Sequence, residues 1–129
     1  MSQIIEMYVV YALQIIIALG LVNVWIVRFH KPTKYRGGSA GNMADEFAVY
    51  GLPKWFMYMV GMAKIAIALC MIVGFWLPIL VYPASALLVL LMIGAISMHI
   101  KVKDPFIKAV PAILVFLMAL MNVVLIGLI

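Results

Sequence analysis

Charged residues and cysteine are both scarce in this sequence. Its 129 residues include nine Lys and Arg, four Asp and Glu and one Cys, so charged residues make up 10% of the chain. A water-soluble domain usually carries about 25% charged residues. With so few polar groups the chain cannot cover a surface that faces water. The single thiol, Cys70, excludes an internal disulfide and a CxxC redox pair, and we interpret it as a small apolar packing residue.

Recognisable catalytic and cofactor motifs are also missing. The sequence has no glycine-rich phosphate loop, no nucleophile elbow, no HExxH and no CxxCH haem attachment site. We therefore predict no metal and no resident cofactor, with a bound quinone or lipid as the exception to examine. No complete catalytic set is present, so whether the chain is an enzyme stays open. The net charge of +5 indicates membrane topology and headgroup contact rather than nucleic-acid binding.

Long apolar runs are what the sequence does contain. Hydrophobic residues make up 69% of the chain, and the mean hydropathy is +1.27. Four runs each supply the roughly 20 residues that a helix needs to cross about 30 Å of hydrocarbon. They predict an all-α fold, a four-helix transmembrane bundle that forms a single membrane domain over residues 1–129. The spans are predicted at about 4–29, 53–75, 78–100 and 105–127. The first run carries Glu6 and is not preceded by a basic residue, so we expect it to stay as a span rather than be removed as a signal peptide.

Basic residues are concentrated on two of the three loops. Five of the nine Lys and Arg flank the first loop and three flank the third, and these eight are Arg28, Lys31, Lys34, Arg36, Lys54, Lys101, Lys103 and Lys108. The positive-inside rule then predicts that loops one and three are cytoplasmic and that both termini lie outside the plasma membrane, the inner membrane of a bacterium.

The first loop contains the pattern of a short amphipathic helix. Gly37 to Gly41 predict a flexible stretch, and Asn42 after it is a good N-cap. Met43, Phe47 and Tyr50 share one apolar face, while Asp45 and Glu46 in the first turn favour the helix dipole. Gly51 can close the helix. We predict a helix over Met43–Tyr50 at the cytoplasmic interface, with an irregular loop packed on the bundle as the alternative.

Lys64 is the most informative residue because it is an ionisable group near the middle of the second span. Such residues usually face the bundle interior and mark a function. Gly61 is on the same face and would let a helix or a flat ligand approach closely. We predict a ligand-binding site formed by Lys64, Gln14, Gly61 and Tyr58, with Gln14 as the hydrogen-bond partner of Lys64. The alternative is a structural lysine satisfied by Gln14, Tyr58 or backbone carbonyls.

Two histidines and a glutamate form a second set of candidates. His99 and His30 end the third and first spans at one depth, where they could exchange protons, contact a partner or only anchor helix ends. Glu6, near the outer end of the first span, is a further candidate for an interface or proton site. No acidic or thiol ligand accompanies the histidines at zinc-site spacing, so the metal prediction remains none.

Polar residues within the other spans are read more simply. Asn23 and Asn122 are expected to form hydrogen bonds between helices. Pro111 should remove one backbone bond from the fourth span, and Asp104 can cap that helix.

Short motifs in the second to fourth spans resemble those of the DoxX-like family. They are the run Tyr50–Gly51–Leu52–Pro53, the run Gly61–Met62–Ala63–Lys64 with Gly74 at the helix end, and the run Gly94 to His99 followed by Lys103–Asp104–Pro105. The resemblance implies four spans with a long first loop. Some relatives belong to membrane oxidoreductase systems that feed quinone, and more distant ones are accessory factors of membrane proteins. Members of the broader group often carry Glu where Lys64 stands, so the resemblance gives no catalytic residue to carry over.

Three functional hypotheses follow. The first is an accessory or assembly subunit of a larger membrane complex, with other membrane subunits or further copies of this chain as partners. The second is a redox-linked protein that binds a quinone or a similar apolar molecule near Lys64. The third is a small transporter.

Overall fold

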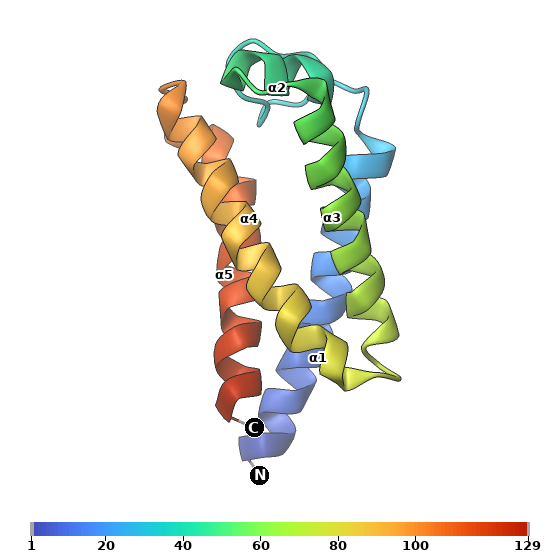
Figure 1. Cartoon of the computed structure of the whole chain (residues 1–129). Coiled ribbons are helices and arrows are strands. Elements are labelled where there is room, and N and C mark those ends of the chain that lie inside the picture. The colour runs from blue at the N-terminus through green and yellow to red at the C-terminus, as the bar shows by residue number, and fades with distance from the viewer. Residues whose placement is uncertain (1, 129) are drawn as a thin grey trace.

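Four long helices make up most of the chain. The computed structural model describes residues 2–128, in which α1 (Ser2–Val22), α3 (Lys54–Val73), α4 (Val81–Lys101) and α5 (Phe106–Leu128) form a bundle (Figure 1). Each is long and apolar enough to cross a membrane. Together with the short irregular helices next to α1 and α4, the spanning segments are Gln3–Val27, Lys54–Val73, Pro78–Lys101 and Phe106–Leu128. These segments begin and end within two residues of the predicted limits, and the all-α fold with four spans is confirmed.

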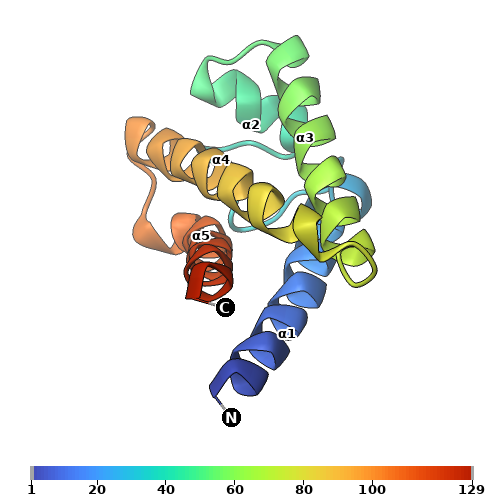
Figure 2. The ribbon, with the colours of Figure 1, turned by 60° about the horizontal axis from the view of Figure 1, so that its bottom comes forward.

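The four helices contact one another in a ring. Helix α1 contacts α3 and α5, and α4 also contacts α3 and α5. The described chain ends lie together at one end of the bundle, which we call the terminal end, and the opposite end is the α2 end (Figure 1). Helices α3 and α4 meet near the turn that joins them and diverge toward the α2 end (Figures 1 and 2). The bundle is therefore wider at the α2 end, where a further element covers it.

That covering element is α2 (Met43–Tyr50), which has the predicted bounds. The Asn42 side chain accepts a hydrogen bond of 2.8 Å from the backbone N–H of Asp45. Gly51 ends the helix with a φ of 79°, a conformation that glycine adopts at little cost. The predicted apolar face of Met43, Phe47 and Tyr50 is buried against the bundle.

Two apolar cores hold the bundle together. The larger one joins α1, α3, α4 and α5 and contains Ile17, Met71 and Leu88, each at most 1% exposed. The second lies beneath α2 and consists of Trp25, Met43, Phe47 and Met57, with partly buried neighbours. Only 22% to 33% of the residues in the four spanning windows are buried, which leaves wide apolar faces for contact with lipid.

Two short irregular helices adjust the ends of the spans. A π-helix, η1 (Asn23–Val27), extends α1, and the backbone N–H of Arg28 closes it on the Asn23 carbonyl at 2.8 Å. A 3₁₀ turn, η2 (Pro78–Leu80), leads into α4. Pro111 lies inside α5 as predicted. The π-helix matters most here, because π-helical turns often occur at functional sites and this one carries Trp25.

Candidate functional site

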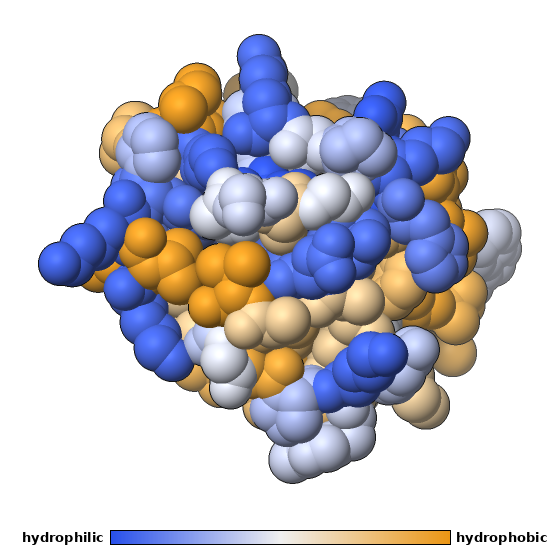
Figure 3. All heavy atoms as spheres, turned by 90° about the horizontal axis from the view of Figure 1, so that it is seen from above, coloured by the Kyte–Doolittle hydropathy of each residue, from blue (hydrophilic) through white to orange (hydrophobic). Residues whose placement is uncertain are grey.

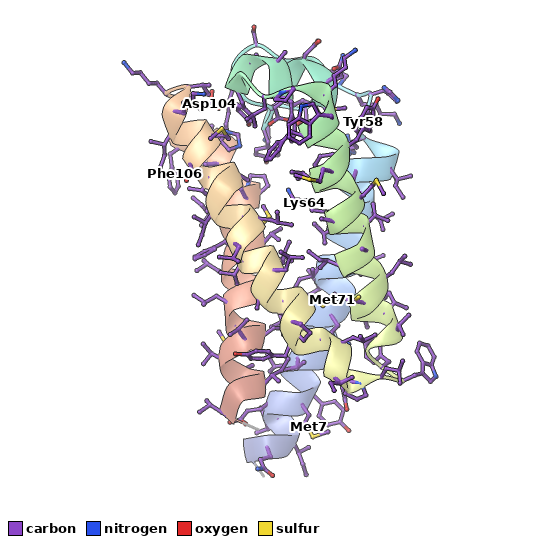
Figure 4. The ribbon with its side chains drawn as sticks, viewed as in Figure 1. Met7, Tyr58, Lys64, Met71, Asp104 and Phe106 are labelled. Atoms are coloured by element: carbon purple, nitrogen blue, oxygen red, sulfur yellow. The ribbon has the colours of Figure 1, made fainter. Side chains whose placement is uncertain are left out.

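Lys64 lies on the inner face of α3, where only 8% of its surface is exposed. Its side chain extends from α3 into the space toward α4 (Figure 4). The Nζ atom is 5.4 Å from the centroid of the Trp25 ring, within the range of a cation–π interaction. Within residues 2–128 the structure shows no hydrogen bond from this amine, so the contact with the indole is the interaction that it makes in the bundle.

Gln14 does not bond to Lys64, which corrects the predicted partnership. Its Nε2 atom donates to the Met71 carbonyl at 2.8 Å. Met71 is seven residues beyond Lys64, or about 10 Å along the helix. In the last turn of α3 the Phe75 N–H bonds to the Ile72 carbonyl, so it leaves the Met71 carbonyl to Gln14. An unpaired carbonyl is costly in lipid, and Gln14 therefore completes the end of α3.

Gly61 and Tyr58 line an open groove between η1 and α3, on the outer side of the bundle. The groove has a volume of about 410 Å³ and is also lined by Trp25, Phe29, His30 and Ile65. A Cβ atom on Gly61 would lie 2.7 Å from Cε3 of Trp25, so only glycine lets the indole pack this closely. The face of Gly61 at which we expected a helix or a flat ligand to approach is therefore covered by Trp25, which also lines the groove.

A second, smaller groove continues from the first toward the terminal end. It has a volume of about 220 Å³ and shares Ile26 and Ile65 with the first groove. Its remaining lining comes from apolar residues of α1 and α3, which are Ala18, Leu19, Val22, Ala68, Leu69 and Ile72. We call these two adjoining grooves the track, and its polar groups, Tyr58 and His30, both line the first groove.

The predicted ligand-binding residues are therefore only partly brought together. Tyr58 and Gly61 share the groove with His30, which the sequence did not associate with them. Lys64 contacts the same Trp25 but is buried and does not line the groove. Gln14 is part of the bundle core near the end of α3. Trp25 is the residue that connects the groove with Lys64. The sequence did not identify it, because its contacts with Gly61 and Lys64 depend on how α1 and η1 pack against α3.

A buried polar network at the α2 end was also missed. Glu46 is 8% exposed and forms an ion pair with Arg36 at 2.9 Å. The other Glu46 oxygen accepts hydrogen bonds from the Tyr50 hydroxyl at 2.8 Å and the Gly37 N–H at 3.0 Å. Burial, followed by the charge and hydrogen bond of Glu46, raises the pKa of Tyr50 above its ordinary value. The sequence did contain a signal for this network, since Glu46 and Tyr50 are four residues apart and therefore lie on the same, buried face of α2.

His99 takes part in a second network, which joins the first loop to the connection between α4 and α5. Its Nδ1 atom is 2.7 Å from Oδ2 of Asp104, and Oδ1 of Asp104 accepts from the Gly38 N–H at 2.9 Å. Lys108 donates to the Gly38 carbonyl. Burial raises the pKa of Asp104, but the Gly38 N–H, His99 and Lys108 outweigh burial and hold this pKa below its ordinary value.

These contacts correct two expectations. The Asp104 carboxylate, expected to cap α5, bonds instead to Gly38 and His99. Gly37 and Gly38, expected in a flexible stretch, are fixed by hydrogen bonds to Glu46, Asp104 and Lys108.

The remaining candidates lie apart from one another. His99 is buried at 7% exposure, whereas His30 is exposed beside the groove. Glu6 is half-buried in α1, near the terminal end and far along the bundle from both histidines. Residues 2–128 contain no group of three or more His, Cys, Asp or Glu that could hold a metal ion.

Of the two asparagines expected to form hydrogen bonds between helices, one forms such a bond in the structure. Asn122 Nδ2 donates to Ser85 Oγ at 3.4 Å, which confirms a hydrogen bond between α5 and α4. Asn23 is exposed, and no such bond is recorded for it within the described chain. Cys70 is a free, half-buried thiol that packs against the larger core, as expected.

Comparison with known proteins agrees with this architecture. No curated protein and no solved structure matches the chain. The DoxX-like family matches residues 12–121, which span all four membrane helices except the first ten residues of α1 and the last turns of α5. This four-helix integral membrane protein therefore belongs to the DoxX-like family.

Proposed function

We propose that this protein binds a membrane-dissolved amphiphilic molecule in the groove between η1 and α3. The observation that supports this function best is the groove itself, which combines an indole wall with two polar groups, His30 and Tyr58. Small-molecule sites are typically apolar concavities with a few polar groups that fix orientation. A quinone has this character, because its ring can lie in the groove against the exposed part of Trp25 and its carbonyls can accept from Tyr58 and His30.

Lys64 has an indirect role in this proposal. Its amine lies over the Trp25 ring, on an indole that also packs on Gly61. The cation and the glycine together favour one orientation of the indole. Lys64 is thus proposed as a positioning residue for the wall of the groove rather than as a direct ligand.

Fluorescence of Trp25 provides the test. Replacing Trp55 and Trp76 by Phe leaves Trp25 as the single tryptophan, since the chain has three. In nanodiscs of zwitterionic lipid, a short-chain quinone should quench this fluorescence with saturation. Tyr58→Phe should weaken the quinone affinity by about five-fold, the effect of one lost hydrogen bond of about 1 kcal/mol.

Two controls make the result decisive. Tyr82→Phe removes the hydroxyl of an exposed tyrosine on α4, away from the groove, and should leave the quenching unchanged. A protein whose only tryptophan is Trp76, in the turn at the terminal end, should show linear quenching without saturation. Linear quenching of Trp25 as well would refute the proposed site.

A role as an accessory or assembly subunit is a second proposal. It is supported by the apolar faces that the spans leave exposed, because another subunit could cover them as well as lipid does. Native mass spectrometry after gentle extraction should then detect a complex with a larger membrane protein. Recovery only as a monomer or homo-oligomer would count against this role.

The transporter hypothesis has less support. Helices α3, α4 and α5 each run as one unbroken helix, whereas carriers usually bind their substrate at discontinuous helices.

A further inference from the structure

The α2 end of the molecule carries an excess of exposed positive charge. Six basic side chains there are exposed, and they are Arg28, Lys31, Lys34, Lys54, Lys101 and Lys103. Two acidic residues at the same end are already paired, Glu46 with Arg36 and Asp104 with His99. Asp45 is the one exposed acid among the described residues. Seen from this end, hydrophilic side chains project around the rim, with less polar residues between them (Figure 3).

Part of this charge lies close in sequence to residues that line the groove. Lys54 begins α3 one turn before Tyr58, so both residues are on the same helical face. Side chains of a helix lean toward its N-terminus, which directs Lys54 away from the bilayer centre and toward the headgroups. Arg28 and Lys31 flank Phe29 and His30, two residues that line the groove.

Polarity then falls steadily along the track. Below Lys54 come Tyr58 and His30 in the first groove, and below these the second groove is lined only by apolar residues. From Tyr58 to Ile72 the track follows α3 for 14 residues, or about 21 Å. One leaflet takes up about half of the roughly 30 Å of a bilayer's hydrocarbon core, so the track is long enough for one long acyl chain.

We propose that the occupant of the track is an anionic phospholipid, with its phosphate near Lys54 and Arg28 and an acyl chain along both grooves. This inference rests on the proposed amphiphile site and names the class of its ligand. The cations select the charge of the headgroup, since each lysine near a membrane surface attracts anionic lipid. The apolar second groove selects a long chain.

Native mass spectrometry can test the selection of the headgroup. The probes are phosphatidylglycerol and phosphatidylcholine with the same two oleoyl chains. One phosphatidylglycerol should remain bound per protein, and phosphatidylcholine should not. Lys54→Gln should weaken retention of phosphatidylglycerol by about five-fold, the equivalent of one lysine near the headgroups. Lys103→Gln is the matched control, because Lys103 is also exposed at the α2 end but follows α4, whereas Lys54 precedes the groove residue Tyr58 on α3.

Selection of the chain needs a second pair of variants. Leu69→Trp should fill the second groove and reduce binding of dioleoyl phosphatidylglycerol while leaving a dihexanoyl form unaffected. Leu90→Trp on α4 is the control, since Leu69 and Leu90 are 62% and 65% exposed. Equal retention of both headgroups, or no effect of Lys54→Gln, would overturn this inference.

The two proposals fail in different ways. Saturable quenching of Trp25 by the quinone, combined with no preference for phosphatidylglycerol, would remove only the anionic-lipid inference. Absence of saturable quenching of Trp25 would remove the amphiphile site itself, and with it this inference, whichever lipid is retained.

Discussion

At the scale of single residues, polar side chains buried in the spans serve two different purposes. Gln14 completes the hydrogen bonding of α3 through the Met71 carbonyl, and Asn122 bonds to Ser85 across two helices. Lys64 instead has an aromatic neighbour, Trp25, and lies beside the groove. Two of these polar residues thus stabilise the bundle, and the third is linked to the candidate site.

Replacing Gln14 with Leu should destabilise the protein without changing ligand binding. The substitution leaves the Met71 carbonyl without its donor inside the bilayer, which should cost about 1–2 kcal/mol of the free energy of unfolding. Unfolding by sodium dodecyl sulfate in mixed micelles measures this difference. Gln3→Leu, at an exposed position of the same helix, is the control and should have little effect. Equal stability of the two variants would argue against a role for the Gln14 bond.

Asp104 should make the stability of the α2 end depend on pH. Its pKa is depressed in the folded protein, so it stabilises the fold above its unfolded pKa of about 3.9, and this stabilisation is lost as the pH falls through the lower folded pKa. Protection of the Gly38 amide from hydrogen exchange, relative to its intrinsic rate at the same pH, should therefore decrease below about pH 4 in the natural protein. Asp104→Asn should show faster exchange at neutral pH and a flatter pH profile. If the variant kept the natural profile, Asp104 would not hold the loop.

At the scale of elements, α2 shows how a short helix becomes part of the bundle. Its limits follow from Asn42 and Gly51, but its position depends on residues far along the chain. Lys101 Nζ donates to the Tyr50 carbonyl at 2.8 Å, and the Tyr50 and His99 rings are 5.9 Å apart. Phe47 also contacts Trp25, with ring centroids 6.0 Å apart. Helix α2 therefore packs on the same indole that lines the groove.

The two ends of the glycine-rich run should respond differently to substitution. A Cβ atom on Gly37 would lie 2.5 Å from Cε1 of Tyr50, so Gly37→Ala should displace α2 and cost about 1–3 kcal/mol. A Cβ atom on Gly41 has nothing within 4 Å. Gly41→Ala should therefore be neutral, or stabilising by up to about 1 kcal/mol. Thermal unfolding in detergent compares the two variants. Equal melting temperatures would mean that the Tyr50 ring can move aside freely when Gly37 gains a Cβ atom.

At the scale of the whole molecule, the basic loops and the chain ends are at opposite ends of the bundle (Figure 1). We propose that the α2 end faces the cytoplasm, as the distribution of Lys and Arg predicts. This orientation would place the mouth of the groove in the cytoplasmic leaflet.

Cysteine labelling checks the orientation. In a Cys70→Ala background, Ser39→Cys in the first loop and Trp76→Cys in the turn at the terminal end are both exposed positions. A membrane-impermeant maleimide applied to intact cells should label Trp76→Cys alone and should reach Ser39→Cys only after permeabilisation. The reverse pattern would invert the proposed topology.

The sequence by itself determined the number of spans, their limits and the bounds of α2. These features depend on the length of apolar runs and on caps within a few residues of each helix end, and such local signals are readable along the chain. Lys64 was also recognisable, because a single ionisable side chain in an apolar run is unusual wherever the helix packs.

Only the tertiary structure decided which polar residues meet. Gln14 bonds to Met71 rather than Lys64 because the relative height of α1 and α3 is set by packing across the whole interface. The groove exists because a π-helical turn brings Trp25 against Gly61, and Asp104 is directed to Gly38 and His99 by the fold of the first loop. The contact between His99 and Asp104 is local, but each of the others joins residues at least 36 positions apart. No local sequence pattern could have specified these long-range contacts.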